Sequence, residues 1–438
     1  SPFIVIWILF SIASFLFIST ALKSRKIICV ATSALRDAPN SNVFISRISK
    51  DLGLNIKVID GEKEAYYGGV AALNLLHDDT FVTVDIGGGS TEFCFVNKGK
   101  VEKSISLNIG TVRIKELYFN KNDIKGAKKY ILDNLKKISN LEIKIPKKVV
   151  GIGGSIRSLS KIVMIKNQYP LDVLHEYMYK VRDEISLFNK ISIAKNNDDL
   201  KSFGVKKDRF DTIKEGAFIF KTILEELEID EVVTSGVGVR EGAYLADLLR
   251  TSNHKFPENF NVSVRSLLDR FQIDEKQSAY LGNNAKKIFD VLKPIHNLDN
   301  KFRSLLVISS KLHSIGSTLN FYKSNDNAFD FILNGLNYDF LHTSRVLVAH
   351  TIKFSKKSLP TRNDILKYEE LLPSLEVMQW MSFMISLNIA INQDLSRPKV
   401  EYILENNTLL ISLLNKSFLI ESNIDKLESP EDLTIKIL

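Results

Sequence analysis

Hydrophobic and polar positions divide residues 26–250 into short apolar runs followed by amphipathic stretches. Apolar runs at Lys26–Ala31 and Asn55–Ile59 predict two strands, and helical patterns follow at 41–52 and 61–76. From 81 to 249 the pattern predicts the order β-β-β-α-β-α-β-α, with glycine-rich turns after the first, fourth and fifth strands. Strands that are followed by helices predict an α/β fold with a mainly parallel sheet.

The two parts of this pattern repeat each other incompletely. Residues 26–76 give only β-α-β-α, and the place of a preceding β-β-β-α is taken by the apolar run Phe3–Leu22. The run is long enough to cross a bilayer, and the basic Lys23, Arg25 and Lys26 follow it. It is either a membrane span or a set of foreign residues at a truncated or misjoined N-terminus, and we expect the second.

After residue 250 a polar linker precedes long helical patterns and then short strand signals. We therefore expect five segments: an apolar segment at 1–25, the remnant of a first α/β domain at 26–76, a second α/β domain at 77–250, a helical domain at 251–395 and a small α+β end cap at 396–438.

Composition narrows the possible partners and the compartment. The net charge of +8 and the pI of about 9.1 favour acidic partners such as polyphosphate, nucleotides, nucleic acid or an anionic membrane. Cys29 and Cys94 are the only cysteines, and both fall in predicted strands. They are typical of buried thiols in a reducing compartment, which predicts a cytoplasmic protein.

The stretch Phe81–Glu92 carries the most specific chemistry. A buried strand ends in Asp85, and Gly87, Gly88, Gly89, Ser90, Thr91 and Glu92 follow it. Consecutive glycines let backbone N–H groups approach phosphate oxygens, and the two acids suit a cation. The stretch is not a Walker A loop, because no lysine follows the glycines, nor a Rossmann fingerprint, because a strand follows where a helix is required. It predicts a site for phosphate and Mg²⁺, and the alternative is an ordinary glycine-rich hairpin turn.

Six segments between residues 26 and 250 match one known family in the same order: Thr32–Asn40, Gly61–Ala65, Asp85–Glu92, Gly110–Arg113, Gly151–Ser155 and Ser235–Gly242. On these segments the chain resembles the Ppx/GppA family of exopolyphosphatases and guanosine pentaphosphate phosphohydrolases. The resemblance implies duplicated actin/hexokinase/Hsp70-like (ribonuclease H-like) domains and a C-terminal helical HD-like domain. The family's first phosphate loop, D-x-G-S-N, has no counterpart before Lys26.

The resemblance also implies roles for individual residues. Glu64 would be the base that positions or deprotonates water, and Asp85 and Glu92 would hold Mg²⁺. The remaining candidates would contact substrate: Arg36, Gly87, Gly88, Gly89, Ser90, Thr91, Gly153, Gly154, Gly236 and Gly238. In the helical domain Ser314 replaces the aspartate of an HD metal site, so we interpret His296, His313, His342 and His350 as core or surface residues.

Two functional hypotheses follow. The first is a Mg²⁺-dependent hydrolase that removes terminal phosphate from polyphosphate or guanosine pentaphosphate (pppGpp), and the second is a catalytically impaired protein that binds phosphate or nucleotide and regulates. The resemblance implies a homodimer without a specific nucleic-acid partner. Membrane contact is expected only if residues 3–22 form a genuine span.

Overall fold

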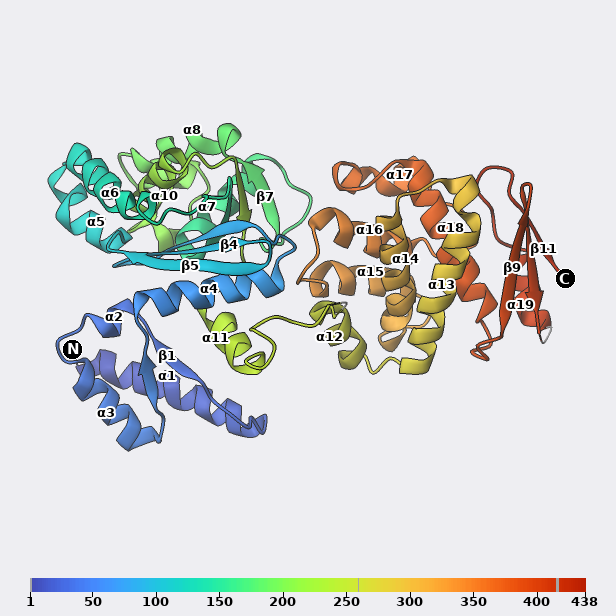
Figure 1. Ribbon diagram of the computed structural model, residues 1–438, viewed down its shortest axis with the longest axis horizontal. Coiled ribbons are helices and arrows are strands. Elements are labelled where there is room, and N and C mark those ends of the chain that lie inside the picture. Colours follow the sequence, from blue (N-terminus) through green and yellow to red (C-terminus); the bar gives the residue numbers. More distant parts are fainter. Residues whose placement is uncertain (1, 259, 415–416) are drawn as a thin grey trace. The chain divides into compact units, whose positions relative to one another are not determined.

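The computed structural model describes every residue except 1, 259, 415 and 416, and it describes side chains from residue 12 onward. The chain divides into two compact units, Ser1–Glu258 and Asn259–Leu438 (Figure 1).

Unit 1 begins with a long helix and then alternates strands with helices. Its elements in chain order are α1 (Pro2–Ala21), β1 (Cys29–Ala31), α2 (Ser33–Arg36), α3 (Ser41–Leu52), β2 (Ile56–Val58), α4 (Gly61–Leu75), β3 (Phe81–Ile86), β4 (Thr91–Asn97), β5 (Lys100–Leu107), α5 (Thr111–Leu117), η1 (Phe119–Lys121), α6 (Ile124–Ser139), β6 (Lys148–Ile152), α7 (Gly153–Lys166), β7 (Tyr177–Lys180), α8 (Val181–Ser192), α9 (Asn197–Ser202), η2 (Lys207–Arg209), α10 (Ile213–Glu226), β8 (Glu231–Thr234) and α11 (Val239–Leu248).

The larger sheet of unit 1 has six strands in the order β5-β4-β3-β6-β8-β7. The β3–β6 and β6–β8 pairs are parallel, whereas the β3–β4, β4–β5 and β7–β8 pairs are antiparallel. The predicted α/β fold is thus confirmed, but the prediction of a mainly parallel sheet is wrong. Short turns join β3, β4 and β5 into hairpins, which forces antiparallel pairing. β7, four residues long, was not predicted at all.

The smaller sheet contains β1 and β2, which pair in parallel with Cys29 opposite Ile56. Helices α2 and α3 connect β1 to β2, whereas the connection from β6 to β8, which are also a parallel pair, contains β7 as well as helices. The internal repeat stays a prediction. Cys94 is buried in β4 and Cys29 is half-buried in β1.

Helix α4 lies on one face of the larger sheet and contacts β3, β4 and β5, while α11 packs against α4 (Figure 1). Glycines make both contacts close. A Cβ atom on Gly242 of α11 would lie 1.8 Å from the carbonyl oxygen of Tyr67, and one on Gly69 would lie 2.1 Å from Sγ of Cys94. The opposite face of the sheet carries the main core, which includes apolar residues of α6, α7, α8 and α10.

Two local predictions in unit 1 need correction. The predicted polar loop 32–40 contains the single helical turn α2, in which the N–H groups of Leu35 and Arg36 both donate to the carbonyl of Thr32. The helical region predicted from Gly110 onward is interrupted between α5 and α6. The interruption occurs at Asn122, whose φ is +55°, and Asp123 then caps α6 by accepting from the N–H of Gly126.

Unit 2 is a helical bundle followed by a small sheet. Its elements are α12 (Val262–Arg270), α13 (Glu275–His296), α14 (Asn300–Leu312), η3 (His313–Thr318), α15 (Ser324–Gly335), α16 (His342–Lys353), α17 (Arg362–Ile365), η4 (Leu366–Leu371), α18 (Leu375–Ile391), β9 (Val400–Glu405), β10 (Thr408–Leu413), α19 (Phe418–Ile424) and β11 (Thr434–Ile437).

The histidines of unit 2 lie mostly in its core. His296, His342 and His350 are buried, and burial lowers the pKa of His350 to about 4. Nδ1–H of His350 donates to the carbonyl of Val346 at 2.9 Å, one turn earlier in α16. This arrangement confirms the interpretation of these three residues as core histidines. The resemblance of unit 2 to an HD-type domain stays a prediction.

Among the helices searched, no single one combines the length and the apolar character needed to cross a bilayer. Ile12–Ala21 is apolar but short, and the segments Arg362–Leu371 and Leu375–Ile391 pass the same test only as a pair bent by 110°. The apolar run at residues 3–22, for which a membrane span was the alternative hypothesis, includes residues 3–11, whose side chains lie outside the described part of the chain.

Candidate active site

Asp85 and Glu92 face each other across the β3–β4 hairpin. The antiparallel register pairs them directly, so both side chains point to the sheet face that α4 covers. Glu92 is only 3 % exposed, and its Oε1 accepts a hydrogen bond from Oγ of Ser106 at 2.8 Å. Burial raises the pKa of Asp85 to about 6 and that of Glu92 to about 8. A cation bound nearby would favour the ionised form of both carboxylates.

Glu64 reaches the same place from the first turn of α4. Asp60 caps this helix, accepting from the N–H of Lys63 at 2.7 Å. The start of α4 sits directly on β5 because Gly61 has no side chain: a Cβ atom there would lie 2.3 Å from Cβ of Ser106. The negative charge of Glu64 raises the pKa of both Asp85 and Glu92. Three predicted site carboxylates are thus close enough to interact.

Arg36 and Thr32 hold Glu64 from the first-domain segment. Nη1 of Arg36 donates to the carbonyl of Ile59 at 2.7 Å and lies 3.4 Å from Oε2 of Glu64. Burial raises the pKa of Glu64, while the charge and hydrogen bond of Arg36 and a hydrogen bond from Thr32 oppose that rise, and the net shift is upward. Glu64 is thus a partly buried carboxylate with fixed orientation, which is what a general base requires.

The turn of residues 87–90 joins β3 to β4 and is also the start of the predicted phosphate site. The N–H of Gly87 donates to the carbonyl of Ser90 at 2.9 Å, so the turn closes a hairpin as the structural alternative predicted. The carbonyls of this turn accept hydrogen bonds from the start of α5. The carbonyl of Gly87 accepts from the N–H of Thr111, and that of Gly88 accepts from the N–H groups of Val112 and Arg113. The carbonyl of Gly89 accepts from the side chain of Arg113.

The N–H groups of Gly88 and Gly89, by contrast, donate to no acceptor among the described residues. Gly88 is exposed. Helix α5 can approach the turn closely because Gly110 has no side chain: a Cβ atom on Gly110 would lie 2.2 Å from the carbonyl oxygen of Gly88. A turn with its carbonyls fixed on one side and its N–H groups open on the other can accept an anion. The hairpin and phosphate-loop hypotheses therefore describe the same turn.

The other two candidates of this stretch, Ser90 and Thr91, form different contacts. Ser90 is buried, and its hydroxyl hydrogen bonds to the carboxylate of Glu92. Thr91 is fully buried, and its hydroxyl donates to the carbonyl of Ile109. Alternation along β4 puts Thr91 on the sheet face opposite Glu92. The structure therefore does not bring Thr91 together with the carboxylates.

Gly153 and Gly154 begin α7 beside Asp85. β3 and β6 run parallel with Asp85 opposite Ile152, so Gly153 follows at the same sheet edge. Gly153 has φ +83°, and a Cβ atom on it would lie 2.2 Å from Oδ1 of Asp85. A Cβ atom on Gly154 would lie 2.7 Å from Nη1 of Arg209. Both glycines thus leave room for charged side chains that the site brings close.

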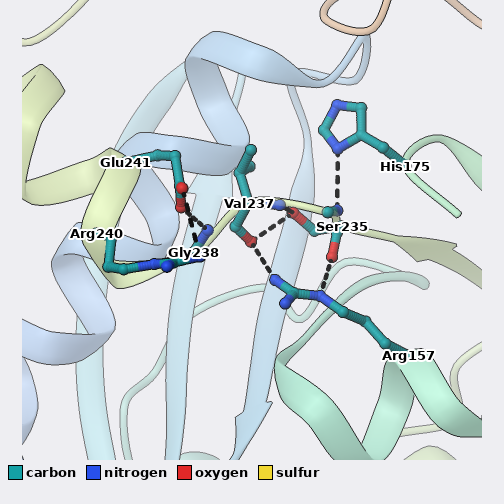
Figure 2. A network of polar contacts seen from close by, with 8 residues as sticks. Arg157, His175, Ser235, Val237, Gly238, Arg240 and Glu241 are labelled. Atoms are coloured by element: carbon teal, nitrogen blue, oxygen red, sulfur yellow. Dashed lines mark hydrogen bonds and ion pairs between the residues drawn. The ribbon is translucent and has the colours of Figure 1, made fainter. Parts of the chain in front are cut away.

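Gly236 and Gly238 lie in the turn between β8 and α11, and their N–H groups are already used. The N–H of Gly236 donates to Nδ1 of His175 at 3.0 Å, and that of Gly238 donates to Oε2 of Glu241 at 2.9 Å (Figure 2). The predicted contact of these glycines with substrate could use their N–H groups only if both bonds broke. The carbonyls of this turn hold Arg157, which was not among the sequence candidates.

Arg157 and Arg209 are the charged residues that the sequence analysis missed. Arg157 is four residues after Gly153, on the first turns of α7, and that spacing places it one turn further along the same helix face. The glycine pair at the start of α7 is therefore the sequence signal that indicates Arg157. Arg209 comes from η2, 55 residues after Gly154 in the sequence, and no local pattern indicates its proximity.

Comparisons with known proteins agree on one family. The model of the Ppx/GppA phosphatase family matches residues 8–251. A bifunctional 3-dehydroquinate synthase/phosphatase of Fusobacterium nucleatum is 32% identical over 229 residues, which are 49% of this chain and 34% of that protein. A guanosine-5'-triphosphate,3'-diphosphate pyrophosphatase of Photobacterium profundum is 25% identical over 350 residues, 77% of this chain and 67% of that protein.

Among solved structures, the Aquifex aeolicus member of the Ppx/GppA protein family is 28% identical, with a TM-score of 0.49 over 56% of this chain and 82% of that one. The chain thus spans about one third of the first curated relative and two thirds of the second.

Proposed function

The chain belongs to the Ppx/GppA phosphatase family, and we propose that it hydrolyses a phosphoanhydride bond, removing the terminal phosphate of inorganic polyphosphate, of pppGpp or of both. The observation that carries this proposal is that Asp85 and Glu92 pair directly across a hairpin whose turn has open N–H groups, with Glu64 near enough for its charge to raise the pKa of both. Phosphoryl transfer to water requires an oriented water and a cradle for the transferred group, and these residues can supply both.

Glu64 is the proposed base. It orients a water molecule and takes its proton as the water attacks the terminal phosphorus, and the bond to the bridging oxygen breaks so that the shortened chain leaves with that oxygen. Arg36 fixes the orientation of Glu64 through the 3.4 Å contact, and its remaining N–H groups can pair with a phosphate oxygen. The N–H groups of Gly88 and Gly89 receive the charge that develops on the transferred phosphoryl group.

Asp85 and Glu92 are the proposed Mg²⁺ ligands. Among the residues that the structure describes, no group of three or more His, Cys, Asp or Glu side chains converges tightly enough to hold a metal ion. Mg²⁺ usually takes only one or two protein carboxylates, with waters and substrate phosphates completing its shell. A directly opposed pair of carboxylates, of which Glu92 is buried and Asp85 is half-buried, fits such an ion. When bound, Mg²⁺ would offset the negative charge of the phosphates.

The substrate class follows from charge and from relatives. The net charge of +8 favours polyanions, and both curated relatives act on phosphate-containing substrates according to their names. Polyphosphate presents a chain of identical phosphates, whereas pppGpp adds a guanosine that needs a separate contact.

The test is phosphate release from both substrates by the full chain. Purified protein is incubated with Mg²⁺ and either long-chain polyphosphate or pppGpp, and inorganic phosphate is measured. We expect one phosphate per terminal bond from at least one of the two. Tight binding of both substrates without phosphate release would contradict hydrolysis and support the regulatory binding protein instead.

A further inference from the structure

The turn between β8 and α11 has the composition of a phosphate loop but not its hydrogen bonding. Three successive N–H groups are occupied: Gly236 donates to His175, Val237 donates to Oγ of Ser235 at 3.2 Å, and Gly238 donates to Glu241. In the turn of residues 87–90, by contrast, the N–H groups of Gly88 and Gly89 are open. These two glycine turns therefore contribute different chemistry.

What the turn between β8 and α11 offers is a pair of carbonyls, and both hold Arg157. Nε of Arg157 donates to the carbonyl of Ser235 at 2.8 Å, and Nη2 donates to that of Val237 at 3.2 Å (Figure 2). These two bonds use one edge of the guanidinium and fix its plane. Nη1 has no hydrogen-bond partner among the described residues, and the guanidinium forms no ion pair with a carboxylate there.

The surroundings of Arg157 are those of an anion site. Arg157 lies on α7 four residues after Gly153, and a Cβ atom on Gly153 would lie 2.2 Å from Oδ1 of Asp85. Its charge opposes the effect of burial, which raises the pKa of Asp85. Burial lowers the pKa of Arg157, the charges of Asp85 and Glu241 raise it, and those of Arg240 and Arg209 lower it. A half-buried arginine that forms no ion pair with a carboxylate is stabilised when an anion arrives.

We propose that Arg157, mounted on the carbonyls of Ser235 and Val237, contacts a phosphate group of the substrate beside Asp85, and that the N–H groups of Gly236 and Gly238 do not. The proposal rests on the proposed function for the identity of the substrate. In this arrangement a side chain takes the place of a second set of backbone N–H donors. One side of the site binds phosphate through the N–H groups of Gly88 and Gly89, and the other side binds it through the guanidinium of Arg157.

His175 is the positioning residue of this arrangement. Because Nδ1 accepts from Gly236, Nε2 carries the proton and donates to the carbonyl of Leu75 at 2.8 Å. Leu75 ends α4, the helix that carries Glu64 on its first turn. The buried imidazole thus joins the turn that mounts Arg157 to the helix that presents the proposed base.

The test measures binding of tripolyphosphate to the full chain by calorimetry, without turnover. Arg157→Met should weaken binding by about tenfold or more, because a charge-assisted contact is lost. Arg157→Lys should recover part of the loss, since the charge remains without the fork. The matched control is Arg182→Met, which removes an arginine that is 77% exposed on α8 and should leave affinity unchanged.

The role of His175 is tested with two substitutions, each of which introduces a side-chain amide. The side-chain oxygen of His175→Asn takes the place of Nδ1 and can still accept from Gly236, whereas His175→Gln places its amide near Nε2 and leaves Gly236 unbonded. We expect the Asn variant to bind tripolyphosphate more tightly than the Gln variant at equal thermal stability. Equal affinities of these two variants would remove His175 from the arrangement.

The outcomes for Arg157 are distinguishable from those for the function as a whole. If Arg157→Met and Arg157→Lys both bind tripolyphosphate as the parent does, the proposal for Arg157 is overturned. A parent that binds tripolyphosphate through Arg157 but releases no phosphate contradicts the hydrolase and leaves the assignment of Arg157 standing.

Discussion

Nη1 of Arg36 lies 3.4 Å from Oε2 of Glu64 and, at the same time, 2.7 Å from the carbonyl oxygen of Ile59. The second contact anchors the guanidinium to the backbone just before α4, so that the first contact has a fixed direction. Arg36 comes from α2 and Glu64 from α4, 28 residues later. The pair therefore connects the small sheet segment to the carboxylates of the larger sheet.

Removing the positive charge of Arg36 should shift the pH dependence of hydrolysis. Burial raises the pKa of Glu64, and Arg36 limits that rise. A base must be unprotonated, so kcat/KM should fall as the pH drops through the pKa of Glu64. Arg36→Met should move this acid limb to higher pH, by up to about one unit. The control is Arg47→Met on the exposed face of α3. If the acid limb of Arg36→Met does not shift, Arg36 does not influence the pKa of Glu64.

Asp85→Asn should weaken the dependence on Mg²⁺. The amide is close in shape to the carboxylate but carries no charge, so the proposed ion loses part of its attraction. We expect half-maximal activity to require about tenfold more Mg²⁺, with lower activity at saturation. Asp78→Asn is the control, because Asp78 pairs with Lys148 at the other end of the strands. Identical Mg²⁺ titrations for Asp85→Asn and the parent would exclude Asp85 as a ligand.

The open turn of residues 87–90 can be tested by two glycine substitutions with opposite effects. A Cβ atom on Gly88 would meet only Cγ2 of Val112, at an ordinary 3.5 Å, so Gly88→Ala should fold normally. It places a methyl group at the open N–H groups and should reduce affinity for tripolyphosphate about tenfold or more.

Gly110→Ala should instead lower the stability of the fold. Its Cβ would lie 2.2 Å from the carbonyl oxygen of Gly88, so the turn and α5 must move apart, at a cost of about 1–3 kcal/mol in stability. Thermal unfolding and calorimetric titration of both variants separate the two effects. Normal phosphate affinity in a well-folded Gly88→Ala variant would show that the turn does not contact phosphate.

Much of the site could be predicted because its signals are local. The strand ending in Asp85, the three glycines and the first-turn position of Glu64 are all visible in short stretches, and the strand alternation that pairs Asp85 with Glu92 follows from the hairpin. The same alternation also predicts that Thr91 points away from Glu92.

The remaining features depend on contacts between distant segments. The N–H of Gly236 is occupied by His175, which is 61 residues earlier, and nothing in the composition of the glycine turn indicates that bond. Arg157 acquires its role only because two carbonyls of the β8–α11 turn hold its guanidinium. β7 depends on its antiparallel pairing with β8, from which α8, α9, η2 and α10 separate it in the sequence.

The central claim is that Glu64 activates the water that attacks the terminal phosphate. Its most direct test is the turnover of Glu64→Gln at saturating substrate, compared with Glu62→Gln, which changes an exposed glutamate in the same helical turn. We predict that Glu64→Gln lowers kcat by ~10²-fold or more while tripolyphosphate affinity stays near that of the parent, and that Glu62→Gln changes neither. A Glu64→Gln variant that releases phosphate at the rate of the parent would contradict the account.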